Sequence, residues 1–280
     1  MTLVSTHWLN ENLSKVIIID CSWHMPSTER DGYREYLEGH IPGAIFFDLD
    51  KNSEPNTDLP HMLPKSAYFQ EVISDLGITN EDKIVIYDNS NVFSACRCWF
   101  TFFYFGHNPK KLEVLDGGLK KWKSENKTIS KTIEPIKKSK YIINEQKNLV
   151  KNIKDINKNI IEQKFEVVDA RSKKRFEGSE PEPRPGLRSG HIEKSKNLPF
   201  TECINKTSNT FKSKENLIKI FENFLFNKTL IFSTWPFPNK YEGIIFLIFM
   251  VLIPFIFKLI LFARLQISLT FFKTFSEEDK

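Results

Sequence analysis

One sequence pattern occurs twice in this chain, about 150 residues apart. An apolar run that ends in an aspartate occupies residues 16–20 and returns at 165–169, so that Asp169 follows Asp20 by 149 residues. The tripeptide Gly-His-Ile returns after 151 residues, and the apolar run at 83–87 returns near 230–233. Near-equal offsets between three separate motifs predict two copies of one structural unit.

In the first copy, apolar runs of strand length alternate with segments of helical periodicity. A first short helix is expected near Trp8, capped by Ser5 or Thr6. Strands that are apolar throughout and alternate with helices predict an α/β fold, with a mostly parallel central sheet flanked by helices. We expect strands at residues 16–20, 44–47, 83–87 and 112–115, and helices at 30–38, 65–76, 93–105 and 118–122.

The repeat predicts two tandem domains, of which the second is incomplete. We expect a first domain at residues 1–125, a Lys- and Asn-rich linker at 126–160, and a second domain at 161–234. In the first copy, the run at 83–87 precedes a long helix, a strand and a Gly-Gly turn. Residues 235–280 contain no such pattern, so the second copy is predicted to stop about two-thirds of the way through the unit.

The tail contains an almost wholly apolar segment at residues 243–263. A helix of this length spans a hydrocarbon core of about 30 Å, and Pro254 and Lys258 are tolerable in such a helix. AT-rich DNA read out of frame also yields Phe, Ile, Leu and Lys in abundance. The segment is therefore either an apolar helix that spans a membrane or part of a tail that is not native.

The composition is that of an ordinary globular protein, with 40% hydrophobic and 27% charged residues. Most of the net charge of +5 comes from lysines in a Lys-, Asn- and Ile-rich stretch, which is typical of a solvated surface. No face rich in arginine or interleaved aromatics stands out, so we expect no nucleic-acid binding. The four cysteines form neither a disulfide framework nor a zinc pattern, so we expect no metal and a cytoplasmic location. A membrane anchor through residues 243–263 is the alternative.

The two copies contain a linked set of short motifs. In the first copy they are Glu38-Gly39-His40-Ile41-Pro42-Gly43-Ala44, Phe47-Asp48-Leu49-Asp50, Leu59-Pro60-His61-Met62-Leu63-Pro64, Ser94-Ala95-Cys96-Arg97 and Asp116-Gly117-Gly118. In the second copy they are Val168-Asp169-Ala170-Arg171, Arg175-Phe176, Glu180-Pro181-Glu182-Pro183-Arg184 and Ser189-Gly190-His191-Ile192.

This set resembles the two-domain rhodanese-family sulfurtransferases over about residues 3–233. Within that family it resembles the 3-mercaptopyruvate sulfurtransferases more than the thiosulfate sulfurtransferases. The second copy departs from the family at Glu193-Lys194, where the family has Pro-Gly, and this departure affects a local turn.

The resemblance implies sulfur transfer without a cofactor. In the family, a cysteine in a loop after a central strand of the second domain attacks the sulfur of 3-mercaptopyruvate or thiosulfate and holds it as a persulfide. A thiol such as thioredoxin, or cyanide, then accepts the sulfur. Arg175 and Arg184 match the family's substrate-binding arginines, and Arg188 is a weaker candidate. Taken alone, Arg184 would be interpreted as a surface arginine between two prolines.

The family's cysteine position, directly after Ser233, is occupied by Thr234. A threonine hydroxyl cannot hold a persulfide, and Pro236 and Pro238 lack the backbone N–H groups that a thiolate-binding loop needs. Cys203 lies about 30 residues too early, Cys98 belongs to the other copy, and Asp88, the first copy's equivalent, is no nucleophile. We therefore expect a sulfurtransferase relative that is inactive as written. The alternative is a non-catalytic, membrane-tethered rhodanese-like binding module.

Five other residues are expected to have structural roles. The resemblance implies that Asp20 and Asp169, each at the end of a buried strand, pair with nearby basic groups. His40 and His191 occupy equivalent positions of the repeat, which favours a shared turn hydrogen bond over catalysis. His61 is expected in a loop or between the two domains.

Overall fold

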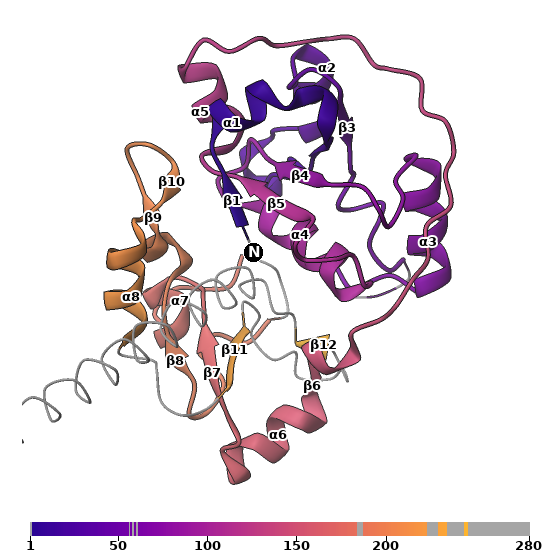
Figure 1. The fold of residues 1–280 in the computed structure, drawn as a ribbon. Helices are drawn as coiled ribbons and strands as arrows, with labels where there is room; N and C mark the ends of the chain where they lie inside the picture. The colour runs from indigo at the N-terminus through magenta and orange to yellow at the C-terminus, as the bar shows by residue number, and fades with distance from the viewer. Residues whose placement is uncertain are drawn as a thin grey trace, which may run out of the picture.

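The computed structural model describes residues 2–55, 57, 59, 61–183, 187–222, 229–233 and 244–245. The first copy forms the predicted parallel sheet, whose strands lie in the order β1-β5-β4-β2-β3 (Figure 1). The strands are β1 (Thr2–Val4), β2 (Ile17–Asp20), β3 (Ala44–Phe46), β4 (Ile84–Tyr87) and β5 (Leu112–Leu115). All but the short β1 lie where the apolar runs predict them.

Helices cover both faces of this sheet, as expected for a parallel sheet with apolar strands. On one face α1, α2 and α5 contribute Leu9, Tyr36 and Trp122 to a buried cluster. On the other face, α3 and α4 bury Phe69 and Trp99. The helices are α1 (Thr6–Glu11), α2 (Gly32–Glu38), α3 (Ser66–Asp75), α4 (Ser94–Tyr104) and α5 (Gly118–Ser124), with 3₁₀ turns at Leu13–Lys15 and Pro26–Thr28. Ser5 caps α1 as predicted, because its side chain accepts a hydrogen bond from the Trp8 N–H.

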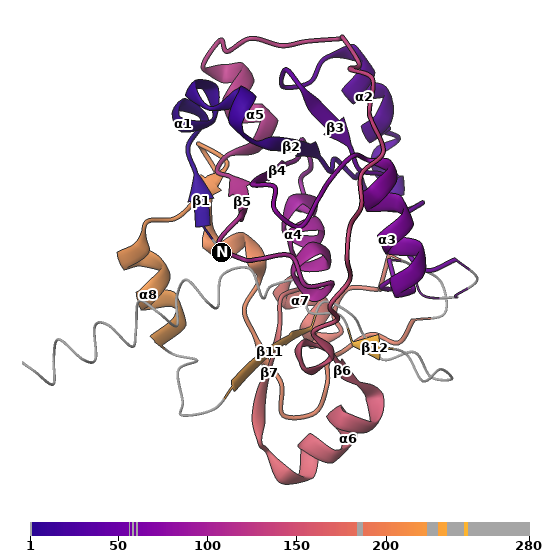
Figure 2. The ribbon, with the colours of Figure 1, turned by 45° about the vertical axis from the view of Figure 1, so that its right-hand side comes forward.

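Much of the predicted linker is hydrogen-bonded to the first copy. His40 and Ser130 form an isolated antiparallel bridge, and Asn80 exchanges two hydrogen bonds with the backbone of Ile142. Tyr141 is buried, and its hydroxyl lies 3.1 Å from His107 Nδ1. Figures 1 and 2 show this segment running over the first copy before it reaches the second. Residues 130–142 therefore form a strap that is bonded to the surface of the first copy, with the side chains of residues 131–138 exposed.

The second copy repeats the central strands of the first. Its parallel sheet has the order β11-β7-β8, which matches β4-β2-β3, and Ser233 of β11 pairs with Asp169 of β7. Within the described residues, this sheet has no counterpart of β5 or β1. Its elements are α6 (Ile153–Glu162), β7 (Phe165–Asp169), α7 (Lys173–Glu177), β8 (Lys196–Asn197), α8 (Lys214–Glu222) and β11 (Thr229–Ser233). Two short antiparallel pairs accompany it, β9 (Ile204–Asn205) with β10 (Thr210–Phe211) and β6 (Lys151–Asn152) with β12 (Ile244–Ile245), as do 3₁₀ turns at Lys147–Leu149 and Phe200–Cys203.

The two copies are packed against each other. The ring of Phe93, just before α4, lies 6.1 Å from Phe200 and 6.0 Å from Phe211 of the second copy. The backbone N–H of Phe211 donates to Asp116 Oδ1 at 2.9 Å. The sequence predicts two domains but not this contact, because neither side shows a periodic pattern.

In the described part of the chain, no helix is both long and apolar enough to cross a membrane. Apart from residues 244–245, the predicted apolar helix at 243–263 lies outside the described residues, as do Thr234 and Arg184. The described residues therefore give no support to a membrane anchor.

The turn at Glu193-Lys194 keeps the backbone conformation of its counterpart in the first copy. Gly43 has a φ of +76°, and Lys194 adopts +61°, a left-handed conformation that is costly for a residue with a Cβ. The Lys194 Nζ donates to the carbonyl of Ile160 at 2.7 Å, near the end of α6. The turn is thus retained without glycine, and the lysine links it to the preceding helix.

We predict that Lys194→Gly unfolds with a free energy about 1 kcal/mol higher than Lys194→Ala. Both variants lose the hydrogen bond to Ile160, but only glycine removes the strain at positive φ. Gly43→Ala is the reverse control, since no atom lies within 4 Å of its added Cβ. Its free energy of unfolding should fall by about the same amount. Urea unfolding measures all three, and equal stabilities of the Gly and Ala variants at position 194 would contradict the conformational account.

Candidate functional site

Acidic residues stand at the carboxyl ends of the central strands in both copies. Asp20 ends β2, Asp88 follows β4, and Asp169 ends β7. In open α/β sheets, ligands bind in the crevice at this edge. Groups that could hold or transform a substrate are therefore expected at this edge of each sheet.

In the first copy, the Asp88 carboxylate lies at the N-terminal end of α4. Its carboxylate accepts hydrogen bonds from the backbone N–H groups of Ser90 at 3.1 Å and Ala95 at 2.7 Å. Burial raises the pKa of Asp88 to about 6. Donors at a helix start are suited to an external anion, but here the chain's own carboxyl group takes them. This edge of the first copy is therefore not a candidate reaction centre.

The resemblance implies a basic partner for Asp20, but among the described residues its carboxylate is held by Ser22 and forms no ion pair. Its Oδ1 accepts hydrogen bonds from the Ser22 N–H at 2.9 Å and the Ser22 hydroxyl at 2.5 Å. Burial raises the pKa of Asp20 to about 6, and the bonds from Ser22 oppose that rise. The neighbouring position is Ser22 in the first copy but Arg171 in the second, which explains the different partner.

In the second copy, Asp169 is held by a buried arginine. Arg171 donates from Nη2 to Asp169 Oδ2 at 2.5 Å, and its Nε lies 3.0 Å from Oδ1. The same guanidinium donates from Nη1 to Glu182 Oε1 at 2.5 Å and from Nη2 to the carbonyl of Gly190 at 2.6 Å. The side chains of Asp169 and Arg171 are each 2% exposed and that of Glu182 is 0% exposed. Arg171 thus joins two buried carboxylates.

Arg175, the first predicted substrate-binding residue, lies at the open end of this arrangement. Its Nε donates to Glu182 Oε2 at 3.1 Å, and its Nη2 forms an ion pair with the same oxygen. The Arg175 side chain is 26% exposed. Its helix, α7, is capped by Ser172, whose hydroxyl accepts from the Arg175 N–H. Arg188 is exposed and, among the described residues, forms no ion pair with this group, while Arg184 lies outside the described residues.

The two predicted structural histidines share the same two local contacts, although His40 is buried and His191 is exposed. His40 Nδ1 lies 2.7 Å from the carbonyl of Tyr36, and His191 Nδ1 lies 2.8 Å from the carbonyl of Phe176. Each imidazole also stacks on the ring of that same aromatic residue. Both copies therefore use one histidine to close the turn after the helix, which is a structural arrangement.

His61 forms a carboxylate–imidazole pair that sequence reasoning missed. Its Nε2 lies 2.7 Å from Asp50 Oδ1, and the indole N–H of Trp23 donates to Asp50 Oδ2 at 2.9 Å. The side chain of His61 is 19% exposed and that of Asp50 66%. A carboxylate often orients the imidazole of a histidine that acts as a general base. Both residues lie in the quoted motifs, but 11 positions apart, and nothing in the sequence pairs them.

The cysteines show no sign of activation. All four are buried, and burial raises the thiol pKa of Cys21 and Cys96 well above the ordinary value and that of Cys203 to about 12. A sulfur nucleophile reacts as the thiolate and needs access to solvent. None of these buried thiols meets both requirements.

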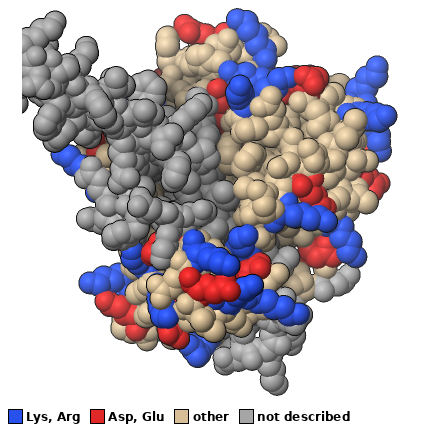
Figure 3. All heavy atoms as spheres, turned by 60° about the horizontal axis from the view of Figure 1, so that its bottom comes forward, with Lys and Arg blue, Asp and Glu red and all other residues tan. Residues whose placement is uncertain are grey.

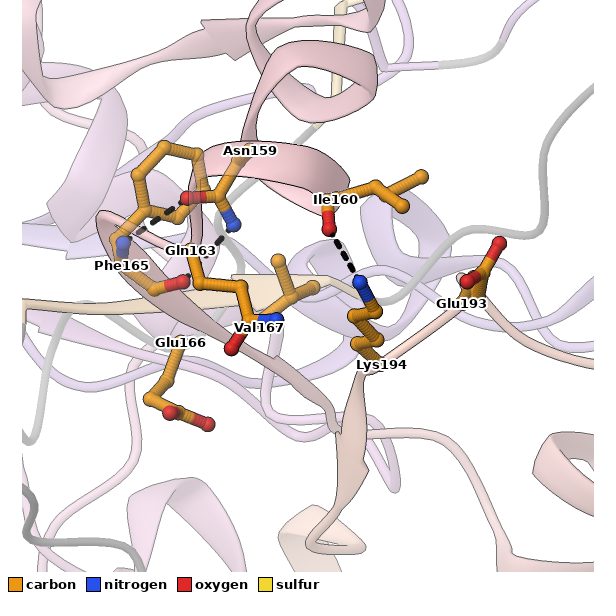
Figure 4. A pocket seen from close by; sticks show the side chains of 8 residues that line it. All are labelled: Asn159, Ile160, Gln163, Phe165, Glu166, Val167, Glu193 and Lys194. Atoms are coloured by element: carbon orange, nitrogen blue, oxygen red, sulfur yellow. Dashed lines mark hydrogen bonds between the residues drawn. The ribbon is translucent and has the colours of Figure 1, made fainter.

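A small hollow in the second copy lies away from this edge. It is lined by the end of α6, the start of β7 and the turn at Glu193-Lys194 (Figure 4). The Asn159 side chain closes one end by exchanging hydrogen bonds with the backbone of Phe165. Because Phe165 begins β7 and Asp169 ends it, the hollow is at the opposite edge of the sheet from Arg175 and is not a candidate substrate site.

Two further features bear on ligand binding, namely groups of metal-ligating side chains and the charge of the surface. Among the described residues, no three His, Cys, Asp or Glu side chains gather as metal ligands. On the face drawn in Figure 3, basic side chains lie among acidic ones. Exposed pairs such as Lys158–Glu162 and Lys173–Glu177 illustrate this mixing.

The fold and these motifs define a class of protein that the comparisons identify. Residues 5–125 match the family model of the rhodanese-like domain. The thiosulfate/3-mercaptopyruvate sulfurtransferase 1 of Arabidopsis thaliana, a mitochondrial protein, is 39% identical over an alignment of 243 residues that covers 79% of this chain and 63% of that protein. The 3-mercaptopyruvate sulfurtransferase of Rattus norvegicus is 38% identical over an alignment of 228 residues that covers 79% of this chain and 76% of the relative.

Solved structures agree with the sequence comparison. The SseA 3-mercaptopyruvate sulfotransferase of Escherichia coli superimposes with a TM-score of 0.78 at 28% identity, over 91% of this chain and 95% of that one. The Tum1 protein of Saccharomyces cerevisiae gives a TM-score of 0.75 at 27% identity, over 84% of each chain. The chain belongs to the family of 3-mercaptopyruvate and thiosulfate sulfurtransferases with the rhodanese fold.

We predict that Arg171→Met lowers the free energy of unfolding of the second copy by about 3–5 kcal/mol, because it leaves two buried carboxylates without their shared cation. Hydrogen exchange of the β7 amides measures this loss directly. Arg34→Gln is the control: it breaks an exposed ion pair with Asp31 and should change stability by less than about 0.5 kcal/mol. A similar small effect for both variants would show that the buried pairing is dispensable.

We also predict that the first copy loses stability as the pH rises from about 4 to about 6. Each folded pKa, about 6 for Asp20 and Asp88, lies above the ordinary value of 3.8, so the folded state binds these protons more tightly than the unfolded state. The unfolding free energy should fall by up to about 3 kcal/mol per carboxyl across this window and change little above it. Tryptophan fluorescence reports it, since four of the five tryptophans lie before residue 123.

Asp20→Asn should reduce this pH dependence by about half, because an amide does not titrate and only Asp88 still contributes. Asp31→Asn is the control, since asparagine caps α2 as well as aspartate does and the group is exposed. A variant at position 20 with the full slope of the unchanged chain would contradict the assignment.

Proposed function

We propose that this chain retains the substrate-binding half of a 3-mercaptopyruvate or thiosulfate sulfurtransferase site and lacks the nucleophile that accepts the sulfur. The observation that carries the proposal is the register of β11. It pairs in parallel with β7 as β4 pairs with β2, so the position after Ser233 corresponds to Asp88 and is occupied by Thr234. Neither residue carries sulfur.

The chemistry of the transfer needs a thiolate at that position. In the family reaction, the thiolate attacks the sulfur of 3-mercaptopyruvate, an S–S bond forms, the C–S bond breaks, and the carbon takes a proton to leave pyruvate. A threonine hydroxyl is protonated at neutral pH and cannot hold sulfur in this form. Pro236 and Pro238 lack the N–H groups that stabilise a thiolate in such a loop. The burial of the four cysteines supports the same conclusion.

The part of the reaction that survives is recognition of a small anion. Arg175 presents a partly exposed guanidinium, and a planar guanidinium binds a carboxylate or a thiosulfate through two parallel hydrogen bonds. Arg184 and Arg188 are proposed to contribute, as the family resemblance implies. A thiol such as thioredoxin, or cyanide, takes sulfur only from a persulfide, so these acceptors have no role in this chain as written.

The membrane-tethered binding module is not part of this proposal. Its main support is the composition of residues 243–263, and no observation on the described residues favours it. A cytoplasmic location stays a prediction from the sequence.

We predict no thiocyanate above background when the full chain is incubated with 3-mercaptopyruvate and cyanide. The rat 3-mercaptopyruvate sulfurtransferase is the positive control for the assay, and Thr234→Ala should behave like the unchanged chain. Turnover that survives Thr234→Ala would show that sulfur is accepted elsewhere and would contradict the proposed site.

A further inference from the structure

Three ion pairs of the second copy join four residues into a row of alternating charge. It runs from Asp169 through Arg171 and Glu182 to Arg175, and every link is a direct contact between charged atoms. Exposure rises only at the last member: the first three side chains are at most 2% exposed, whereas Arg175 is 26% exposed. The chain of charges thus begins in the core and ends at the surface.

We propose that Glu182 and Arg171 are positioning residues that set the orientation of the Arg175 guanidinium for its anionic substrate. This inference rests on the proposed function, in which Arg175 contacts that substrate. The substrate class is a small anion with a planar or trigonal oxygen group, namely a 3-mercapto carboxylate or thiosulfate.

The anchor of this arrangement is the sheet itself. Asp169 is the last residue of β7 and pairs with strands on both sides, so its carboxylate has little freedom. Arg171 is fixed to it through Nε and Nη2 and is fixed a second time by the carbonyl of Gly190. Glu182 lies in a segment without regular secondary structure and is oriented by the two arginines. The position of Asp169 in the strand thereby fixes, through Arg171, the position of the Glu182 carboxylate.

Glu182 in turn fixes the plane of Arg175. It accepts from both Nε and Nη2, which lie on the same edge of the guanidinium. In the described part of the chain, no hydrogen bond engages Nη1, so that edge remains for a ligand. An arginine held through one edge gives up less freedom when the other edge binds, which strengthens binding.

Glu182 also carries a charge of the same sign as the substrate, and this makes its role testable. If the carboxylate only neutralised Arg175, removing its charge would tighten the binding of an anion. If it positions Arg175, removing the charge weakens binding even though a repulsion is removed. The two roles therefore predict changes of opposite sign.

The test is calorimetric titration of the full 280-residue chain with thiosulfate, and separately with 3-mercaptopyruvate, at pH 7.5. Glu182→Gln should weaken both by about tenfold, the order of one charge-assisted hydrogen bond. Glu166→Gln is the matched control: it removes one carboxylate charge from β7, paired with Lys196 at 3.1 Å, and has no contact with Arg175. This control should leave both affinities within about twofold.

Two further variants separate positioning from stability. Glu182→Asp keeps the charge but shortens the side chain, so it should also weaken binding, and it decides the matter if Glu182→Gln does not fold. In a chain that already carries Arg175→Ala, Glu182→Gln should have no further effect on affinity, because it acts through that arginine. A purely structural role would lower the melting temperature in both backgrounds without this dependence.

The outcomes separate the proposed anion binding from the proposed positioning role of Glu182. If the unchanged chain binds neither anion, the proposed function is overturned and this inference falls with it. If the unchanged chain binds, and Glu182→Gln binds equally well or more tightly, the positioning role alone is overturned. Weaker binding by both Glu182 variants, abolished in the Arg175→Ala background, supports it.

Discussion

The structure depends on how the acids at the carboxyl ends of its parallel strands are accommodated. Strands of one direction bring these ends to one edge, where Asp20, Asp88 and Asp169 are all nearly excluded from water. The first copy keeps its two carboxyl groups on hydrogen-bond donors, and burial raises both pKa values to about 6. The second copy instead provides a buried cation, Arg171, in direct contact with its acid. The carboxylates of the first copy are held by neutral donors, whereas that of the second copy is held by an arginine that leads to Arg175.

In the first copy, the chain's own carboxylates take the hydrogen-bond donors at this edge of the sheet. The Asp88 carboxylate accepts from the N–H groups at the start of α4, and Ser22 donates to Asp20. Phe93 and Asp116 of the first copy contact Phe211 of the second. In the second copy the cation leads outward through Glu182 to Arg175. The two copies share the order of their three corresponding strands but differ at a few positions that follow those strands. The proposed loss of the nucleophile at Thr234 is independent of this divergence.

The sequence predicts what depends on local pattern and misses what depends on contacts between loops. The strands at 112–115 and 165–169 match β5 and β7, and the cap at Ser5 is confirmed, because burial and capping leave periodic or positional signals. The strap at residues 130–142 has no such signal, since its bonds go to distant backbone groups. The Asp50–His61 pair and the Arg171–Glu182 pair were missed for the same reason: each joins residues about ten positions apart in irregular segments, where no period applies.

The central claim is that this chain recognises a sulfur donor but cannot take its sulfur. Mass spectrometry of the intact chain, after incubation with 3-mercaptopyruvate and removal of the free donor, tests that claim most directly. The account predicts an unchanged mass, because Thr234 holds no sulfur and the four cysteines are buried. A gain of one sulfur atom that is released by cyanide would show that a persulfide forms on this chain, and the account would be wrong at its centre.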